Sequence, residues 1–202
     1  MTNALPIPDG ALRERMATEV PAGMMAHIDR VVALADRLAG HHGLDVPLTR
    51  LMAQGHDLLR AEQPADLFAR AIARGLPIDP VERDVPVILH GPLAALELRE
   101  RFEVTDQRVF DAIWWHTTGH PNYSGEAWAM FVADKAEPHK VERWPVLQSV
   151  LDAATGEDGG SASLERAALV YLDLRMHEAV REHQQVHPMA TLTRNHLLRR
   201  LG

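Results

Sequence analysis

The fold is decided around LMAQGHDLLR, residues 51–60, where apolar side chains recur on both sides of an adjacent histidine and aspartate. This pattern predicts one helix that begins at Pro47 or Leu48 and carries four apolar residues, Leu51, Met52, Leu58 and Leu59. Gly55 lies inside the predicted helix, where glycine costs up to about 1 kcal/mol relative to alanine. Its presence indicates a local bend or the close approach of a bulky group.

His56 and Asp57 are the informative pair within this helix. Neighbouring residues on a helix point about 100° apart, so their side chains rarely enter the same apolar core. A buried histidine followed by a buried aspartate would be costly unless a cation satisfied both. One carboxylate can also bridge two metal ions about 3.5–4 Å apart. The dipeptide alone is more typical of solvated side chains, so a metal site needs support from the rest of the chain.

Helical periodicity extends over most of the sequence. Further helices are expected at residues 21–40, 64–75, 86–102, 106–119, 124–138, 143–155, 163–186 and 190–201. Asp106 is expected to be an N-cap, and one of Trp114 and Trp115 to turn inward. The one candidate strand is VPVILHG, residues 85–91, which reads equally well as a turn into a helix. We therefore predict an all-α fold, a single-domain helical bundle over residues 1–202.

Composition excludes several classes of protein. A chain of 202 residues favours one domain, and the absence of cysteine excludes disulfides, iron–sulfur clusters and cysteine nucleophiles. The net charge of −7 argues against binding to nucleic acid or an anionic membrane. No apolar run is long enough to span a bilayer, and the first residues lack the order of a signal peptide. A cytoplasmic location is expected.

Twelve histidines form the unusual part of the composition. Successive candidate ligands lie 29, 33, 26 and 18 residues apart, so each would come from a different helix and face a shared interior. Imidazole and carboxylate donors favour Fe, Mn, Zn, Co or Ni over Mg. Because these positions are flanked by apolar residues, the sequence favours metal ligands over solvated side chains. The predicted metal ligands are His27, His56, Asp57, His90, His116 and Asp134.

Five segments in order, HIDRVVALADRLA, GHDLLR, LHG, HTTG and ADKAEP, resemble the HD-domain phosphohydrolases of the YqeK group. The resemblance covers about residues 24–140, which would form the metal-binding core, with residues 141–202 as a C-terminal helical extension. It implies two transition metals, most readily iron, with Mn, Co, Ni or Zn as alternatives. It assigns one metal to His27, His56, Asp57 and Asp134, and the other to Asp57, His90 and His116.

The same resemblance implies a nucleotide substrate, diadenosine tetraphosphate, hydrolysed symmetrically to two ADP. Asp57 and Arg60 would be catalytic. Arg60 stands where the family has lysine and would bind phosphate. Substrate contacts are expected from Arg60, Thr117, Thr118, Gly119 and Lys135, although helix termination explains Thr117–Gly119 equally well. A homodimer is left open.

Three positions depart from the family pattern. Trp114 and His120 stand where the family has basic residues, and Lys140 stands where it has arginine. These changes leave the ligand set intact and alter the periphery that would hold phosphate. Two alternatives therefore remain: a phosphohydrolase acting on nucleoside monophosphates or a guanosine alarmone, and a catalytically weak metal or nucleotide sensor.

Overall fold

The computed structural model describes residues 11–202, and no β-strand occurs in that range. The all-α prediction is confirmed. The helices are α1 (Ala11–Met16), α2 (Ala22–His41), α3 (Val46–Gly55), α4 (Pro64–Ala73), α5 (Pro80–Asp84), the 3₁₀ helix η1 (Pro86–Leu89), α6 (His90–Arg101), α7 (Gln107–Trp114), α8 (Gly125–Lys135), α9 (Pro138–Arg143), the 3₁₀ helix η2 (Pro145–Leu147), α10 (Gln148–Thr155), α11 (Leu164–Arg181) and α12 (Pro188–Leu201).

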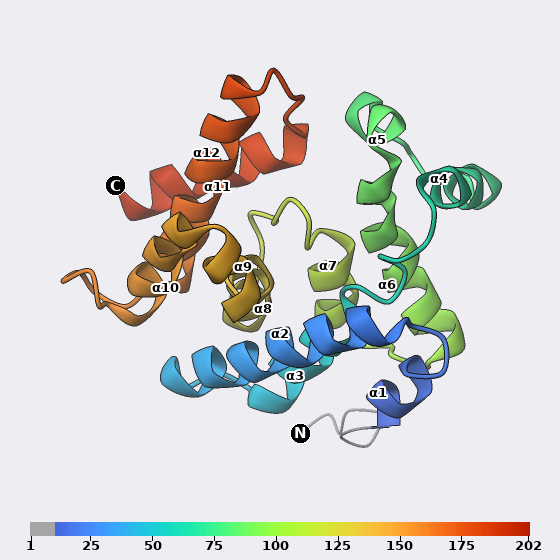
Figure 1. Ribbon diagram of the computed structural model, residues 1–202, viewed down its shortest axis with the longest axis horizontal. Helices are drawn as coiled ribbons and strands as arrows, with labels where there is room; N and C mark the ends of the chain where they lie inside the picture. The colour runs from blue at the N-terminus through green and yellow to red at the C-terminus, as the bar shows by residue number, and fades with distance from the viewer. Residues whose placement is uncertain (1–10) are drawn as a thin grey trace.

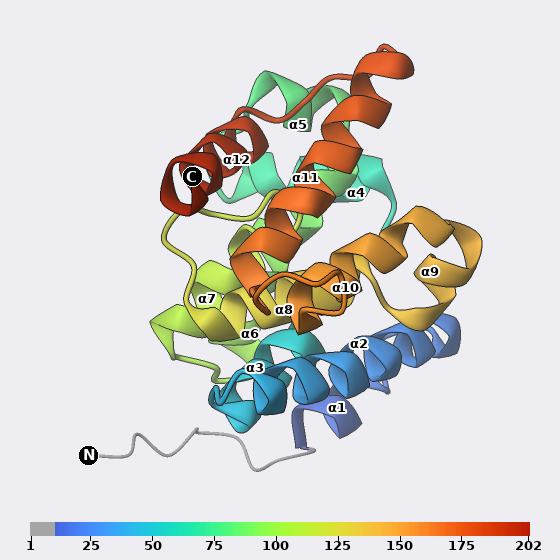
Figure 2. The ribbon, with the colours of Figure 1, turned by 90° about the vertical axis from the view of Figure 1, so that its left-hand side faces the viewer.

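Helix α8 forms the centre of the bundle. Every residue from Ala127 to Lys135 is buried, because α2 and α3 pack on one side of this helix and α11 on another. Figures 1 and 2 show α2 running below α8 with α3 packed against it, and α6 and α7 lying side by side. A helix that is buried all round suits the continuous apolar run AWAMFVA.

Side-chain caps fix where several helices begin. Asp45 accepts a hydrogen bond from the backbone N–H of Leu48 at the start of α3. Asp106 accepts one from Arg108 N–H at the start of α7, which confirms the predicted N-cap. Each cap satisfies a donor that the helix itself cannot use. The caps therefore set the points at which the chain enters the core.

The predicted helix around residues 47–59 is too long. Helix α3 ends at Gly55, and residues 56–61 form turns, so Leu58 and Leu59 are buried outside the helix. A Cβ on Gly55 would lie 2.6 Å from Leu98 Cδ1, so the glycine allows α6 to approach closely. The chain then turns at His56, which places the two adjacent polar side chains at a helix end.

Other elements differ at their boundaries. Three short helices, α1, α5 and α9, were not predicted, because five or six residues are too few to show a period. Trp114 and Trp115 are both half-buried, and Trp114 packs against the core, in line with the expectation that one of them turns inward. The VPVILHG segment is η1 leading into α6, as the turn-into-helix interpretation predicts. Among the described residues, no helix is long and apolar enough to cross a membrane.

Candidate metal centre

Three histidines meet at the ends of helical segments. His56 follows the last residue of α3, His90 begins α6, and His116 lies in the turn after α7. Each ring donates from Nδ1 to the carbonyl three residues earlier: His56 to Ala53 and His116 to Ile113, both at 2.8 Å, and His90 to Val87. Since a carbonyl only accepts, Nδ1 carries the proton and Nε2 of a neutral ring offers its lone pair.

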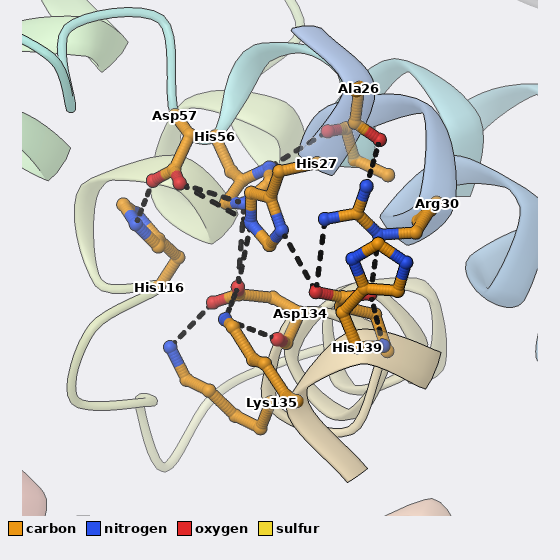
Figure 3. Close-up of polar contacts among 12 residues, drawn as sticks. Ala26, His27, Arg30, His56, Asp57, His116, Asp134, Lys135 and His139 are labelled. Carbon is orange, nitrogen blue, oxygen red and sulfur yellow. Dashed lines mark hydrogen bonds and ion pairs between the residues drawn. The ribbon is translucent and has the colours of Figure 1, made fainter. Parts of the chain in front are cut away.

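Asp57 is buried and joins two groups of histidines. Figure 3 shows it beside His27, His56 and His116. Its Oδ1 lies 3.1 Å from His90 Nε2 and 3.4 Å from His116 Nε2. Its Oδ2 lies 3.5 Å from His27 Nε2 and 3.6 Å from His56 Nε2. The two oxygens of one carboxylate thus serve two separate sets of imidazole nitrogens, each compact enough to hold an ion.

The first set gathers around His56, whose side chain is fully buried. Its Nε2 has no hydrogen-bond partner among the described residues, and Asp134 Oδ1 lies 3.6 Å away. His27 Nε2 lies 3.5 Å from the same Asp134 oxygen. A buried polar atom without a partner is costly, and these separations leave room for an ion about 2 Å from each donor. The first set therefore fits a metal.

The second set brings His90 Nε2 and His116 Nε2 within 2.9 Å of each other. Both rings give their Nδ1 proton to a backbone carbonyl, so in the neutral state two lone pairs would face one another. That arrangement needs a shared proton or a cation between the rings. With Asp57 Oδ1 beside both nitrogens, a metal cation satisfies all three donors.

The protonation of the centre follows from burial and from its neighbours. Burial would lower the pKa of His27, but contacts with the Asp134 and Asp57 carboxylates outweigh it and raise the pKa to about 9. Burial lowers the pKa of His116 to about 4, against the contact with Asp57. Burial would also raise the pKa of Asp57, but the surrounding histidines hold it well below its usual value. The centre keeps its carboxylate charged and His116 neutral at pH 7.

Glu137 orients His27 from outside the ligand set. Its Oε1 lies 3.3 Å from His27 Nδ1, and its Oε2 accepts from Arg30 Nε at 2.7 Å (Figure 3). Oε2 also accepts from the backbone N–H of His139, which caps α9. An outer carboxylate of this kind fixes the tautomer of a ligating histidine. Neither Glu137 nor Arg30 is among the site residues predicted from the sequence.

Two lysines hold Asp134. Lys135 Nζ lies 2.6 Å from Asp134 Oδ2, and Lys140 Nζ lies 2.7 Å from Oδ1. Burial would raise the pKa of Asp134, but the two ammonium groups and the nearby histidines lower it well below its usual value. Lys140, which sequence reasoning noted only as a departure from the family pattern, thus reaches the centre.

The expected substrate residues lie in different surroundings. Arg60 is exposed, and its side chain makes no ion pair within residues 11–202. Thr117 and Thr118 line a cavity beside His116. Gly119 has a φ of 69° and packs against Thr193 and Trp128, so the turn itself requires a glycine there. The structure brings the threonines and Lys135 near the centre and gives Gly119 a role in the turn.

The two positions that lack the expected cations are aromatic. Trp115 stacks on His120 with ring centroids 5.5 Å apart, and Trp114 packs partly buried against the core. Trp114 and His120 both lie on the segment that carries His116. This segment therefore presents ring faces where a phosphate-binding cation is expected.

The arrangement can hold two cations side by side through one bridging carboxylate. Such a pair can polarise a phosphoryl oxygen and generate a nucleophile from water near neutral pH. The donors are imidazole and carboxylate, which suit transition metals better than magnesium.

The comparisons with known proteins agree with this geometry. The sequence profile of the HD domain matches residues 24–139. A Halalkalibacterium halodurans protein named bis(5'-nucleosyl)-tetraphosphatase, symmetrical, is 31% identical over 55% of this chain and 55% of its own length. A Bacillus subtilis protein of the same name is 27% identical over 85% of this chain and 88% of its own. An uncharacterized Lactococcus lactis protein is 30% identical, again over 55% of its length.

The match thus spans about half the length of two of these relatives. Among solved structures, a predicted HD superfamily hydrolase involved in NAD metabolism from Clostridium acetobutylicum superposes with a TM-score of 0.85. That alignment covers 96% of this chain and 98% of the other at 21% identity, and so speaks for the fold alone. With the HD profile covering more than half of the chain, and with histidines and aspartates converging as described, the chain belongs to the HD domain family.

Proposed function

We propose that the protein is a metal-dependent phosphohydrolase that cleaves diadenosine tetraphosphate symmetrically into two ADP. The observation that carries the proposal is Asp57, whose two oxygens face two separate sets of histidines. Relatives that bear the name of a symmetrical tetraphosphatase support the choice of substrate.

The chain's own residues divide the work. Asp57 holds both sets of ligands together, and Glu137 with Arg30 keeps His27 turned toward Asp134. Lys135 lies beside Asp134, where an ammonium group can neutralise a phosphate oxygen. When bound, two metal ions supply Lewis acidity toward phosphate and lower the pKa of water. Arg60, which is exposed and has no ion pair with another described residue, is assigned to binding a terminal phosphate.

For the metals we propose iron, from the resemblance to the YqeK group. The four histidines and two carboxylates also suit Mn, Co, Ni or Zn. Elemental analysis of protein purified without a histidine tag identifies the metal, with one to two ions per chain expected. Finding none, even after reconstitution with Fe or Mn, would overturn the metal site.

The substrate is tested by product analysis. The metal-loaded protein is given diadenosine tetraphosphate, and an early time point is separated by chromatography. ADP as the sole nucleotide product is expected, whereas equal amounts of AMP and ATP would show asymmetric cleavage. Nucleoside monophosphates and guanosine tetraphosphate, run beside it, would reveal the alternative substrates. Metal binding without turnover of any of them would favour a sensor.

A further inference from the structure

Two cavities flank the metal centre and meet at helix α11. The first, here called the α9 cavity, has a volume of about 470 Å³ and is lined by Lys135, Lys140, Arg143, Trp144, Tyr171 and Arg175 among others. The second, the α5 cavity, has a volume of about 660 Å³ and is lined by Ile88, Thr117, Thr118, Tyr171, Arg175 and Gln184 among others. Tyr171 and Arg175 therefore belong to both.

Each cavity is lined by residues next to a different metal ligand, although no ligand itself lines either cavity. The α9 cavity starts at Lys135 and Lys140, whose ammonium groups contact the two oxygens of Asp134. The α5 cavity starts at Thr117 and Thr118, which directly follow His116. In the view of Figure 2, α11 passes between α9 and α12. A molecule that occupies both cavities therefore contacts the residues that they share, Tyr171 and Arg175, with its ends beside neighbours of Asp134 and His116.

Charge and ring chemistry distinguish the α9 cavity from the rest of the protein. The chain carries a net charge of −7, yet four cationic side chains and a single acid, Glu178, line this cavity. Arg175 contacts Glu178, and 41% of the Arg175 side chain remains exposed. The half-buried ring of Trp144 lies in the same wall. Cations with an aromatic face suit a nucleoside phosphate, because phosphate pairs with arginine and a base stacks on a ring.

We infer that the two cavities hold the two nucleoside halves of one dinucleoside polyphosphate, and that Arg175 binds the phosphate chain between them. The inference rests on the proposed function, which supplies the class of substrate. Both volumes fall in the range of small-molecule sites, roughly 300–1,000 Å³. A substrate cut in the middle needs a subsite on each side of the metals, and Arg175 lines both cavities.

The first test measures how many ADP molecules bind to each chain. The metal-loaded protein is titrated by calorimetry with ADP, and separately with a diadenosine tetraphosphate analogue whose bridging oxygens are replaced by methylene groups. We expect two ADP per chain and one analogue per chain, since each ADP fills one cavity and the analogue fills both. One ADP per chain would overturn the inference.

The second test removes the shared cation. Arg175→Met keeps an unbranched apolar stem without the charge, Arg175→Lys keeps the charge, and Arg181→Met removes an exposed arginine elsewhere on the same helix. For Arg175→Met we expect KM for diadenosine tetraphosphate to rise about tenfold or more, the order of a lost charge-assisted hydrogen bond. The metal content and the hydrolysis of bis(p-nitrophenyl) phosphate, which reaches only the metals, should stay unchanged.

The variants separate two kinds of failure. Arg175→Lys should recover part of the affinity, and Arg181→Met should match the wild type. Equal losses on both substrates, or no difference between the Met variants, would overturn the role of Arg175. A wild-type protein that releases no ADP from diadenosine tetraphosphate would instead overturn the proposed function, and the ADP count would still decide whether two cavities bind nucleotide.

Discussion

At the scale of single residues, Asp57 is the residue that links the two sets of candidate ligands. Each of the four surrounding histidines contacts one oxygen of this carboxylate, whereas Asp57 contacts all four. Among the described residues, Asp57 is the one that both groups of candidate ligands share. Removing its charge should thus act on both sets at once.

Asp57→Asn is therefore expected to abolish binding of a metal pair while it preserves the shape of the side chain. Metal occupancy should fall sharply, and hydrolysis should fall by several orders of magnitude. His27→Ala and His90→Ala each remove a ligand from one set and should cost less. Elemental analysis and turnover of the three variants check this order. An Asp57→Asn protein that retains two metals would contradict the bridging role.

Arg60→Ala is expected to weaken substrate binding or turnover by roughly 1–3 kcal/mol, the range for a lost charge-assisted bond. Metal content should not change, because Arg60 is exposed and pairs with no described residue. Arg199→Ala, an exposed arginine on α12, serves as the control. Loss of metal in Arg60→Ala would show a structural role instead.

Gly91→Ala is expected to disturb the second set of ligands through packing. The added Cβ would lie 3.0 Å from the carbonyl of Trp114 and 3.2 Å from His116 Nδ1. Overpacking of this kind costs about 1–3 kcal/mol, and here it should also lower metal content. Gly40→Ala is the matched control, because nothing lies within 4 Å of its Cβ and helix propensity gains up to about 1 kcal/mol. Urea unfolding and elemental analysis compare the two variants.

At the scale of elements, capping ties the stability of α7 to pH. The hydrogen bond from Arg108 to Asp106, together with the capping N–H of Arg108, lowers the pKa of Asp106 below its usual 3.8, against burial. A lowered folded pKa stabilises the protein above pH 3.8, and the contribution is lost as pH falls through the folded value. Asp106→Ala should cost about 1 kcal/mol at pH 7.

That cost should shrink as the pH is lowered from 7 to below 3.8. Unfolding free energies of both proteins, measured metal-free so that release of metal does not contribute, test the trend. A cost that stays constant over this range would show that the charge of Asp106 is unimportant.

The sequence predicts these elements unevenly, for physical reasons. Long amphipathic helices such as α2 follow from periodicity, and the Asp106 cap follows from side-chain chemistry. The end of α3 does not, because it depends on α6 approaching Gly55 from a distant part of the chain. The ligand candidates could be found from histidines and carboxylates among apolar residues. The hydrogen bonds that orient these ligands could not be predicted, because pairs such as Arg30 and Glu137 come together only after folding.

At the scale of the whole molecule, one apolar core runs from Leu12 on α1 to Leu197 on α12. This continuity supports our proposal of a single domain over residues 1–202, in which residues 141–202 extend the core formed by 24–140. Assembly as a homodimer stays a prediction. Because the ligands come from separate helices around α8, a bound metal would hold the halves of this core together.

Removal of metal is therefore expected to lower the stability of the whole bundle. An ion that binds only the folded state adds about 2.7 kcal/mol when its concentration is roughly a hundredfold above Kd. Thermal unfolding of chelated and reconstituted protein should show a higher Tm with metal. The Asp57→Asn protein should respond far less. Equal Tm values for chelated and reconstituted wild type would contradict this prediction.

The distance along the chain between His27 and Glu137, 110 residues, has a consequence for biosynthesis. A ribosome releases His27, His56 and Asp57 well before Asp134 and the carboxylate that orients His27 have been made. A nascent chain at that stage lacks Asp134 and Glu137, so it should hold an ion less tightly than the finished protein. The full set of ligands forms only when α8 docks against α2, so tight retention of metal should follow that step.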